Sequence, residues 1–203
     1  MKTMKISVYK TSALILLLSI FTLSFAGSKE IRNTFSWKYK INKDAIVTMD
    51  NYDCNLSIHT WDKGETELRL FVDAETSSEE DAKILEEYLN NLVFSNTSST
   101  IAFRSRFWEN RNTVQFINLK RISMKLGNGK SVTLSSFKIE GELWIPSACR
   151  FELDSKYSQI TMENFSGPLK LGLYNENLTG GKVSADIEIT DKYSTIELND
   201  TKK

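Results

Sequence analysis

The sequence predicts a mainly β protein built on a short β-solenoid of about 18 residues per coil, with an inserted β-sheet segment that carries one α-helix. Two observations predict this class: a gap-free repeat near the C-terminus, and a further copy of the same pattern far upstream. Only 2 of the 203 residues are Pro, while Thr, Ser and β-branched residues are frequent, which favours strands over helices.

The repeat occupies the C-terminal quarter of the chain. Residues 151–162, 169–180 and 187–198 form rows that begin 18 residues apart and align without a gap. Each row reads apolar-x-apolar, then a polar corner, then apolar-x-apolar, which is typical of two short strands with one inward face. Strands this short cannot bury themselves, so we expect the rows to stack as successive coils around a shared core.

Residues 47–58 form a fourth row at a constant offset of 104 from residues 151–162. Val47 falls on Phe151, and Asp50 falls on Asp154. Any β-rich segment aligns loosely with another, but several coincident columns without a gap favour a true repeat. We therefore expect the upstream row to be a neighbouring coil.

Residues 62–146 interrupt the repeat and predict a sheet extension with one helix. A Ser N-cap and three acidic residues at 77–81 precede an apolar stripe at helical spacing, which predicts a core-packing helix over 77–92. Alternating patterns predict strands at 66–74, 100–107, 114–126 and 131–145. A hairpin turn is expected at 127–129, and Pro146 should end the last strand.

The first 26 residues are typical of a bacterial signal peptide. Lys2, Lys5 and Lys10 precede an apolar run at 13–23, and residues 24–26 end in a small-residue cleavage pattern. Cleavage after Ala26 would leave residues 27–203 as a single exported domain, periplasmic or on the cell surface or secreted. The alternative is an uncleaved anchor, but the apolar run is shorter than the ~20 residues that a membrane span needs. No later stretch is apolar enough to span a membrane.

The charge and the two cysteines bound the function further. Residues 27–203 hold 23 basic and 26 acidic residues, a net charge of −3 that does not indicate nucleic-acid binding. An oxidising compartment makes a Cys54–Cys149 disulfide the default. The repeat alignment counts against that disulfide, because it places the two cysteines about nine extended positions apart, beyond the ~7 Å reach of a disulfide. Two free, partly buried thiols are expected.

No motif for catalysis, metal binding or a cofactor is present in the sequence. The one histidine, His59, aligns with Glu163 at an expected outward corner, which favours a solvated turn over a catalytic base. Asp154 and Asp191 near the corners would suit Ca²⁺ binding or acid–base catalysis. The middle row carries Gly172 and Leu173 at these positions, so solvated corners are the favoured interpretation.

Two groups of residues are candidates for ligand contact. Tyr residues recur near one corner and are expected to pack an edge of the coils, with sugar stacking as the alternative; they are Tyr52, Tyr157, Tyr174 and Tyr193. The segment 103–111 combines basic and aromatic residues, and Lys120 and Arg121 follow it. Alternation places Arg104, Arg106 and Trp108 on one face, with Arg111 nearby. Protection of a sheet edge together with core packing is the favoured role, and a surface for an anionic glycan or lipid headgroup is the alternative.

The order of these segments resembles a bacterial adhesin-domain family whose adhesin name is provisional. The resemblance rests on the signal peptide, the early coil at 50–58 with its Trp-Asp corner at 61–62, the inserted α/β segment, the return strand at 141–146 and the Lys-Tyr-Ser coils. It covers residues 45–200. It implies a solenoid fold of unknown function, common in Bacteroidota, with no catalytic residues to transfer. This chain departs from the family's longer members by ending after about three C-terminal coils.

These observations lead to an exported, non-catalytic binding or scaffold protein, adhesin-like, with no cofactor. A glycan or another envelope protein is the expected partner. Two rival hypotheses are an envelope sensor or structural partner protein, and a carbohydrate-active enzyme on a short β-helix that would need a carboxylate cluster on one face.

Overall fold

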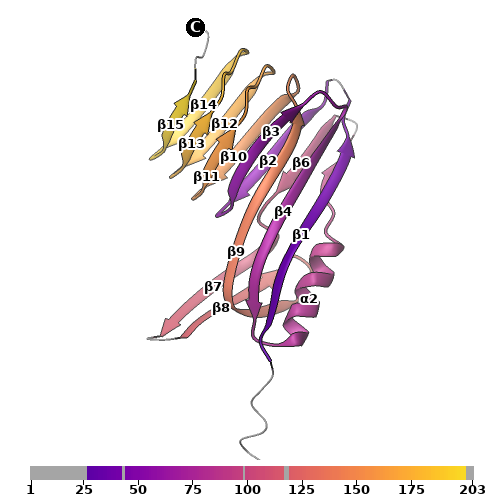
Figure 1. Cartoon of the computed structure of the whole chain (residues 1–203), viewed down its shortest axis with the longest axis vertical. Helices are drawn as coiled ribbons and strands as arrows, with labels where there is room; N and C mark the ends of the chain where they lie inside the picture. The colour runs from indigo at the N-terminus through magenta and orange to yellow at the C-terminus, as the bar shows by residue number, and fades with distance from the viewer. Residues whose placement is uncertain (1–26, 43, 98, 117–118, 200–203) are drawn as a thin grey trace, which may run out of the picture.

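The protein is mainly β, with one helix and two open sheets in the part of the chain that the structure describes (Figure 1). The structure is a computed structural model, and it describes residues 27–42, 44–97, 99–116 and 119–199. In spatial order, the larger sheet contains β1 (Lys29–Lys40), β4 (Glu65–Thr76), β9 (Ser131–Pro146), β3 (Asn55–Trp61), β11 (Gln159–Met162), β13 (Asn177–Gly180) and β15 (Thr195–Leu198). Two further strands branch from β9: β8 (Leu119–Leu126) pairs with β9, and β7 (Trp108–Phe116) pairs with β8. The smaller sheet contains β14 (Ile187–Lys192), β12 (Leu169–Tyr174), β10 (Arg150–Lys156), β2 (Ile46–Tyr52), β6 (Thr100–Arg104) and β5 (Ser95–Asn96).

The repeat rows pair as parallel neighbours in both sheets, in the register of the sequence alignment. In the smaller sheet, Phe151 lies opposite Leu169 on one side and opposite Val47 on the other. In the larger sheet, Ile160 lies opposite Leu178 and Leu56 in the same way. The 18-residue and 104-residue offsets are therefore both confirmed as strand registers.

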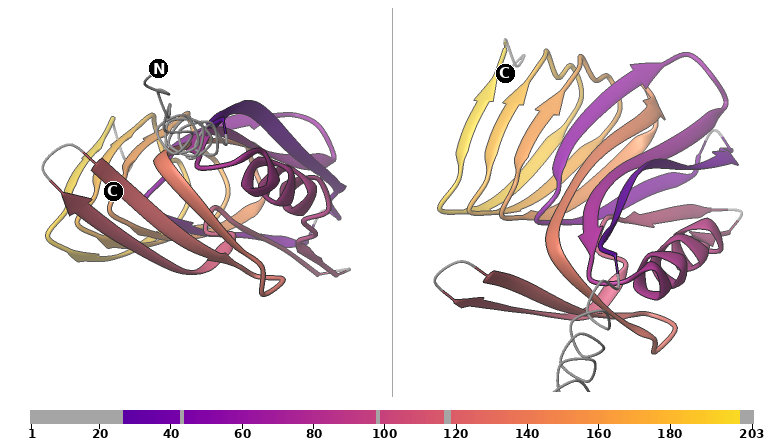
Figure 2. Two further views of the ribbon diagram at one scale, coloured as in Figure 1. Left: turned by 90° about the horizontal axis from the view of Figure 1, so that it is seen from below. Right: turned by 60° about the horizontal axis from the view of Figure 1, so that its bottom comes forward.

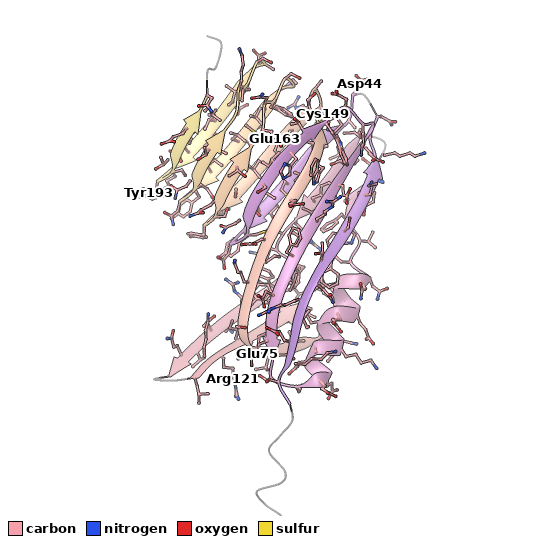
Figure 3. The ribbon with its side chains drawn as sticks, viewed as in Figure 1. Asp44, Glu75, Arg121, Cys149, Glu163 and Tyr193 are labelled. Atoms are coloured by element: carbon pink, nitrogen blue, oxygen red, sulfur yellow. The ribbon has the colours of Figure 1, made fainter. Side chains whose placement is uncertain are left out.

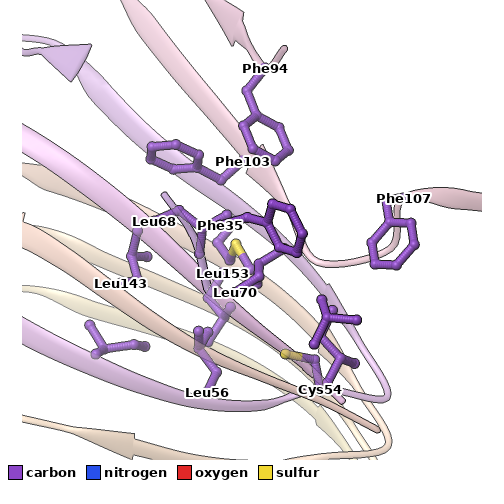
Figure 4. Packing of buried hydrophobic residues seen from close by; sticks show 14 of the residues in the cluster. Phe35, Cys54, Leu56, Leu68, Leu70, Phe94, Phe103, Phe107, Leu143 and Leu153 are labelled. Atoms are coloured by element: carbon purple, nitrogen blue, oxygen red, sulfur yellow. The ribbon is translucent and has the colours of Figure 1, made fainter. Parts of the chain in front are cut away.

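The apolar columns of the rows form part of the core between the two sheets, and Figure 4 shows Leu56 and Leu153 of these columns among buried residues of the insertion. Val47, Leu56, Phe151 and Ile160 are each at most 1% exposed. Burying a side chain of this size contributes about 1.5–3 kcal/mol relative to leaving it in water. Stacking thus gives the short strands of the inner rows a burial that they cannot reach alone, whereas the last row, β14 and β15, stays largely exposed.

Each row turns from one sheet to the other through a residue in the left-handed region. Asp53, Tyr157, Asn175 and Tyr193 occupy this position, with φ of 51°, 63°, 55° and 64°. The backbone N–H of each of the first three donates to a carbonyl of the next row, at 2.9, 3.2 and 2.9 Å. The corner is therefore a repeated, hydrogen-bonded turn.

The inserted segment extends both sheets beyond the first repeat row. β6 pairs with β2 in parallel, and β9 pairs with β3 in parallel, so the insertion adds one more level to the stack. β4 and β1 then continue the larger sheet in antiparallel fashion, and α2 (Glu79–Asn90) lies beside them (Figure 2).

Three of the predicted elements need correction. The single strand expected at 114–126 is wrong, because β7 and β8 form an antiparallel hairpin there. The strand expected at 100–107 ends at Arg104, where Ser105 leaves the ladder and its Oγ accepts the N–H of Tyr52 at 2.9 Å. The helix expected at 77–92 spans only 79–90, because Ser78 is the N-cap and accepts the Asp81 N–H, and the Asn91 side chain caps the last turn.

The two cysteines are free and more deeply buried than expected. Cys54 is 1% exposed and Cys149 is 5% exposed. Burial raises the pKa of each thiol to about 12. Both thiols are therefore protonated at neutral pH.

The predicted signal segment, residues 1–26, and the last four residues lie outside the described part of the chain. In the described part, no helix has the length and apolar character needed to cross a membrane.

Candidate ligand-binding face

The outward face of the smaller sheet gathers the polar side chains of five parallel strands. Alternation sends every second residue of β2, β6, β10, β12 and β14 outward, and the parallel register lines these residues up in columns across the sheet. We call this surface the sheet-B face. It has an acidic groove at its centre and a row of cations and tyrosines along its corner.

The groove has a volume of about 550 Å³, a size typical of small-molecule sites. Its polar walls are formed by Asp50, Arg104, Glu152, Asp154 and Lys170. The loop before β5 forms its rim, where Val93 is 76% exposed. Gly172 lines the groove beside Asp154, and its missing side chain leaves space above the sheet.

The central carboxylates come from neighbouring strands. Asp50 of β2 lies directly opposite Asp154 of β10, and Arg104 of β6 lies opposite Asp50 on the other side. The groove therefore presents two acceptor carboxylates beside a guanidinium, a set that can hydrogen-bond several hydroxyl groups of one ligand.

The tyrosines form a continuous edge-to-face ladder along the corner. Ring centroids lie 5.6 Å apart from Tyr52 to Tyr157, 5.4 Å from Tyr157 to Tyr174 and 6.0 Å from Tyr174 to Tyr193. These separations fit favourable aromatic pairs, which confirms the predicted packing role. Tyr157 is 45% exposed and Tyr193 is 73% exposed, so the ladder also presents ring surface to solvent (Figure 3).

Cations alternate with the tyrosines in the outermost column. The register places Lys156 between Tyr52 and Tyr174, and Lys192 beyond Tyr174. The Arg106 guanidinium lies 5.5 Å from the Tyr52 ring centre, and the Lys192 ammonium lies 5.1 Å from that of Tyr193. The corner is therefore cationic and aromatic, next to a groove that is acidic at its centre.

The structure separates the four residues predicted as a ligand surface. Arg104 lines the groove and Arg106 joins the tyrosine row. Trp108 was expected on the same face, but it is only 5% exposed and packs edge-to-face on Phe107 and Phe137. The turn after Arg104 breaks the alternation on which that prediction depended.

Arg111, the fourth predicted residue, contacts the corner at Asp53 and lies outside the groove. Its guanidinium pairs with Asp53, and it stacks 5.0 Å from the Trp108 ring centre. Asp50 and Lys156, which do belong to the sheet-B face, were not among the predicted ligand residues. The repeat alignment placed both in its columns, so it held the signal that would have identified them.

Asp154 and Asp191 do not form a pair. Asp154 points outward beside Asp50, whereas Asp191 shares its column with Ser155 and Leu173, which point into the core. Within the described residues, no cluster of His, Cys, Asp or Glu side chains has an arrangement that would hold a metal ion.

His59 is not at a solvated turn. It lies in β3, on the outward face of the larger sheet, where its ring stacks on Trp144 at 4.3 Å. Its Nδ1 lies 3.0 Å from Glu163 Oε1, and Glu163 Oε2 accepts the Thr60 N–H at 2.8 Å. These contacts hold the pKa of Glu163 below its ordinary value, with the Thr60 N–H as the largest cause. His59 and Glu163, which the sequence alignment placed at equivalent positions, are therefore in direct contact between two rows.

No protein family and no curated protein matches this sequence. One solved structure, a provisionally named lipid binding protein from Parabacteroides distasonis, overlaps 83% of this chain and 61% of its own chain. The TM-score is 0.30 and the sequence identity is 14%. The chain thus spans about six-tenths of that protein, and a likeness this weak says nothing about function.

Proposed function

We propose that this chain is an exported, non-catalytic binding protein that recognises a glycan on its sheet-B face. One observation carries the proposal: the groove and the row of cations and tyrosines lie on the same face, in columns aligned by the parallel register. Carboxylates that accept hydrogen bonds from hydroxyl groups, next to exposed tyrosine rings, provide the two contacts that a sugar ring needs. The corner cations favour an anionic glycan.

We further infer that the stacked rows are a short β-solenoid of the adhesin-like kind. The equal 18-residue offsets in both sheets, the repeated left-handed corner and the shared apolar columns support this architecture. In a stack of this kind, residues on one face recur at each level, so a face of the stack suits an extended, repeating ligand. An oligosaccharide has that form.

The surroundings of His59 and of the two cysteines, side-chain types that often act in catalysis, support a non-catalytic role. The His59 Nδ1 atom is bound to Glu163, and its ring lies on Trp144, away from the groove. Both thiols have a pKa of about 12 and are buried, so neither supplies a thiolate nucleophile.

A glycan-cleaving enzyme is the second candidate, and the Asp50–Asp154 neighbours favour it. Parallel neighbours lie about 4.8 Å apart at the backbone, and retaining glycosidases use two carboxyl groups about 5–5.5 Å apart. Turnover of a polysaccharide that is lost on both Asp50→Asn and Asp154→Asn would establish this activity. Binding without turnover supports the first proposal.

The test of the binding proposal is an array of neutral and anionic glycans probed with the purified protein. Hits are titrated by calorimetry against Arg104→Ala, Lys156→Ala and Tyr193→Ala. Lys130→Ala is the matched control, because Lys130 is an exposed cation in the β8–β9 turn, outside the groove and the row.

We expect each of the three variants to weaken binding by about fivefold or more, as the loss of one charged or stacking contact costs about 1 kcal/mol or more. Lys130→Ala should leave binding unchanged. A protein that binds no glycan but forms a stable complex with another envelope protein would contradict the proposal and support a structural-partner role.

A further inference from the structure

The β7–β8 hairpin extends beyond the sheet that supports it. β8 pairs with β9 only from Ile122 to Lys125, and beyond this point β7 and β8 pair only with each other. Figures 1 and 2 show the hairpin leaving the end of the long sheet that is farther from the stacked rows, on the side away from α2, and projecting to the same side as those rows. Its far end is therefore held by no other described element.

The far end of the hairpin exposes apolar side chains. Leu119 is 74% exposed and Val114 is 50% exposed, whereas Ile122 at the base is 3% exposed. Val114 lies directly opposite Arg121, so Val114, Leu119 and Arg121 share one face of the hairpin by alternation. Apolar side chains that the fold leaves in water at the end of a projecting element indicate a docking surface.

The same end of the hairpin is basic. Lys120 and Arg121 have no ion-pair partner among the described residues, whereas Lys125 and Arg111 nearer the base pair with Glu109 and Asp53. No acidic residue occurs in the sequence between Glu109 and Glu140. The described residues at the hairpin end are therefore apolar and positively charged, with Lys120 on the opposite face from Val114, Leu119 and Arg121, and no acidic residue lies nearby in the sequence.

We propose that the β7–β8 hairpin docks on an anionic lipid bilayer through the described residues near its end, 114 and 119–121. Val114 and Leu119 enter the boundary between the headgroups and the acyl chains, while Lys120 and Arg121 extend along the surface to lipid phosphates. A second protein would need a larger apolar area than these two side chains offer. An anionic bilayer matches both features, because it supplies an apolar layer under a layer of negative charge.

The experiment is co-sedimentation with vesicles of phosphatidylcholine alone or mixed with phosphatidylglycerol, at low and high salt. The variants are Lys120→Gln with Arg121→Gln, and Val114→Asp with Leu119→Asp. The controls are Lys130→Gln and Val93→Asp, an exposed cation and an exposed apolar residue outside the hairpin. All proteins are expressed identically, so any contribution of residues 1–26 is common to all of them.

We expect binding to the anionic vesicles that weakens at high salt and is absent from phosphatidylcholine alone. Each lost cation should reduce the affinity about fivefold, so the double Gln variant should bind about 25-fold more weakly. The double Asp variant should lose binding about tenfold or more, and both controls should bind like the unchanged protein.

Three outcomes would overturn the proposal. The first is the absence of binding to anionic vesicles, and the second is binding that neither hairpin variant reduces. The third is a dimer in sedimentation velocity that the double Asp variant dissociates, with no vesicle binding. That result would assign the hairpin to a second copy of this chain. None of these outcomes bears on the sheet-B face, which is tested by glycan binding.

Discussion

Glu67 is a buried carboxylate whose charge is stabilised by three neighbours on the outward face of the larger sheet. Its side chain accepts hydrogen bonds from Arg69 Nε at 2.6 Å and Ser36 Oγ at 2.8 Å, and Lys38 Nζ lies 3.4 Å away. These contacts, led by the Arg69 hydrogen bond, lower the pKa of Glu67 from 4.5 to about 2. The ionised form is therefore favoured in the folded protein.

This shift predicts an acid-dependent stability. A carboxyl group with a lowered folded pKa stabilises the fold fully above its unfolded pKa of 4.5 and loses that contribution as the pH falls towards 2. The shift corresponds to about 3 kcal/mol. The measurement is the free energy of unfolding in urea between pH 5 and pH 2. Glu67→Gln should remove most of the Glu67 contribution to its decrease with falling pH. Glu163→Gln, at a carboxylate with a 51% exposed side chain, should remove much less. Equal slopes for Glu67→Gln and the unchanged protein would contradict this account.

Substitutions at Tyr193 can separate two effects on stability, the backbone strain of the left-handed corner and the packing of the ring. Its φ is 64°, in a region that costs a residue with a Cβ about 1–2 kcal/mol. Both Tyr193→Gly and Tyr193→Ala remove the ring, but only Gly relieves the backbone. We expect Tyr193→Gly to be the more stable by about 1 kcal/mol in thermal unfolding.

The same two substitutions at Tyr174 should show the opposite order of stability, with Tyr174→Ala more stable than Tyr174→Gly. Tyr174 lies at the end of the regular strand β12, where Gly costs about 0.5–1 kcal/mol relative to Ala. The same order at both positions would mean that the corner stores no backbone strain.

At the scale of elements, the connection between β11 and β12 depends on one close approach. A Cβ at Gly167 would lie 2.0 Å from the Cys149 carbonyl oxygen, and the Gly167 N–H donates to the Ser147 carbonyl at 3.0 Å. Gly167→Ala should therefore destabilise the fold by about 2–3 kcal/mol, because backbone must move.

Gly172→Ala is the control for that substitution. A Cβ at Gly172 would meet no atom closer than 3.7 Å. The stability of the Gly172→Ala variant should therefore stay within about 1 kcal/mol of that of the unchanged protein. Denaturant midpoints of the two variants give the comparison. Similar midpoints would show that the Gly167 contact is not needed for folding.

The elements of the insertion were only partly predictable from sequence. Helix α2 and the β8–β9 turn carry strong local signals, an N-cap with first-turn acids and a Gly-Asn-Gly turn. The β7–β8 hairpin was missed, because no Gly or Pro interrupts the alternating run at 114–126. Trp108 was misplaced for a related reason, since the turn after Arg104 depends on a tertiary hydrogen bond between Ser105 and Tyr52.

At the scale of the whole molecule, the stack of rows was predictable, and its two ends differ. Columns of similar side chains in the sequence alignment identify which strands are neighbours, even when 104 residues separate them in the chain. The level that β6 and β9 add at one end carries no repeat signal and was not predicted. At the other end, Ile189 is 39% exposed, and Asp191 puts a charge on the inward column of the edge strand. An inward charge of this kind hinders pairing with another strand.

The sheet-B face depends on the parallel register, and a cysteine cross-link between neighbouring rows can test that register. Thr48 and Glu152 are opposite each other in β2 and β10, and parallel neighbours about 4.8 Å apart can form a disulfide. We predict that Thr48→Cys with Glu152→Cys cross-links under mild oxidation. Thr48→Cys with Asp154→Cys, on the same face but about 8 Å apart, should not. Cross-linking of the second pair in preference to the first would contradict the register and the binding face built on it.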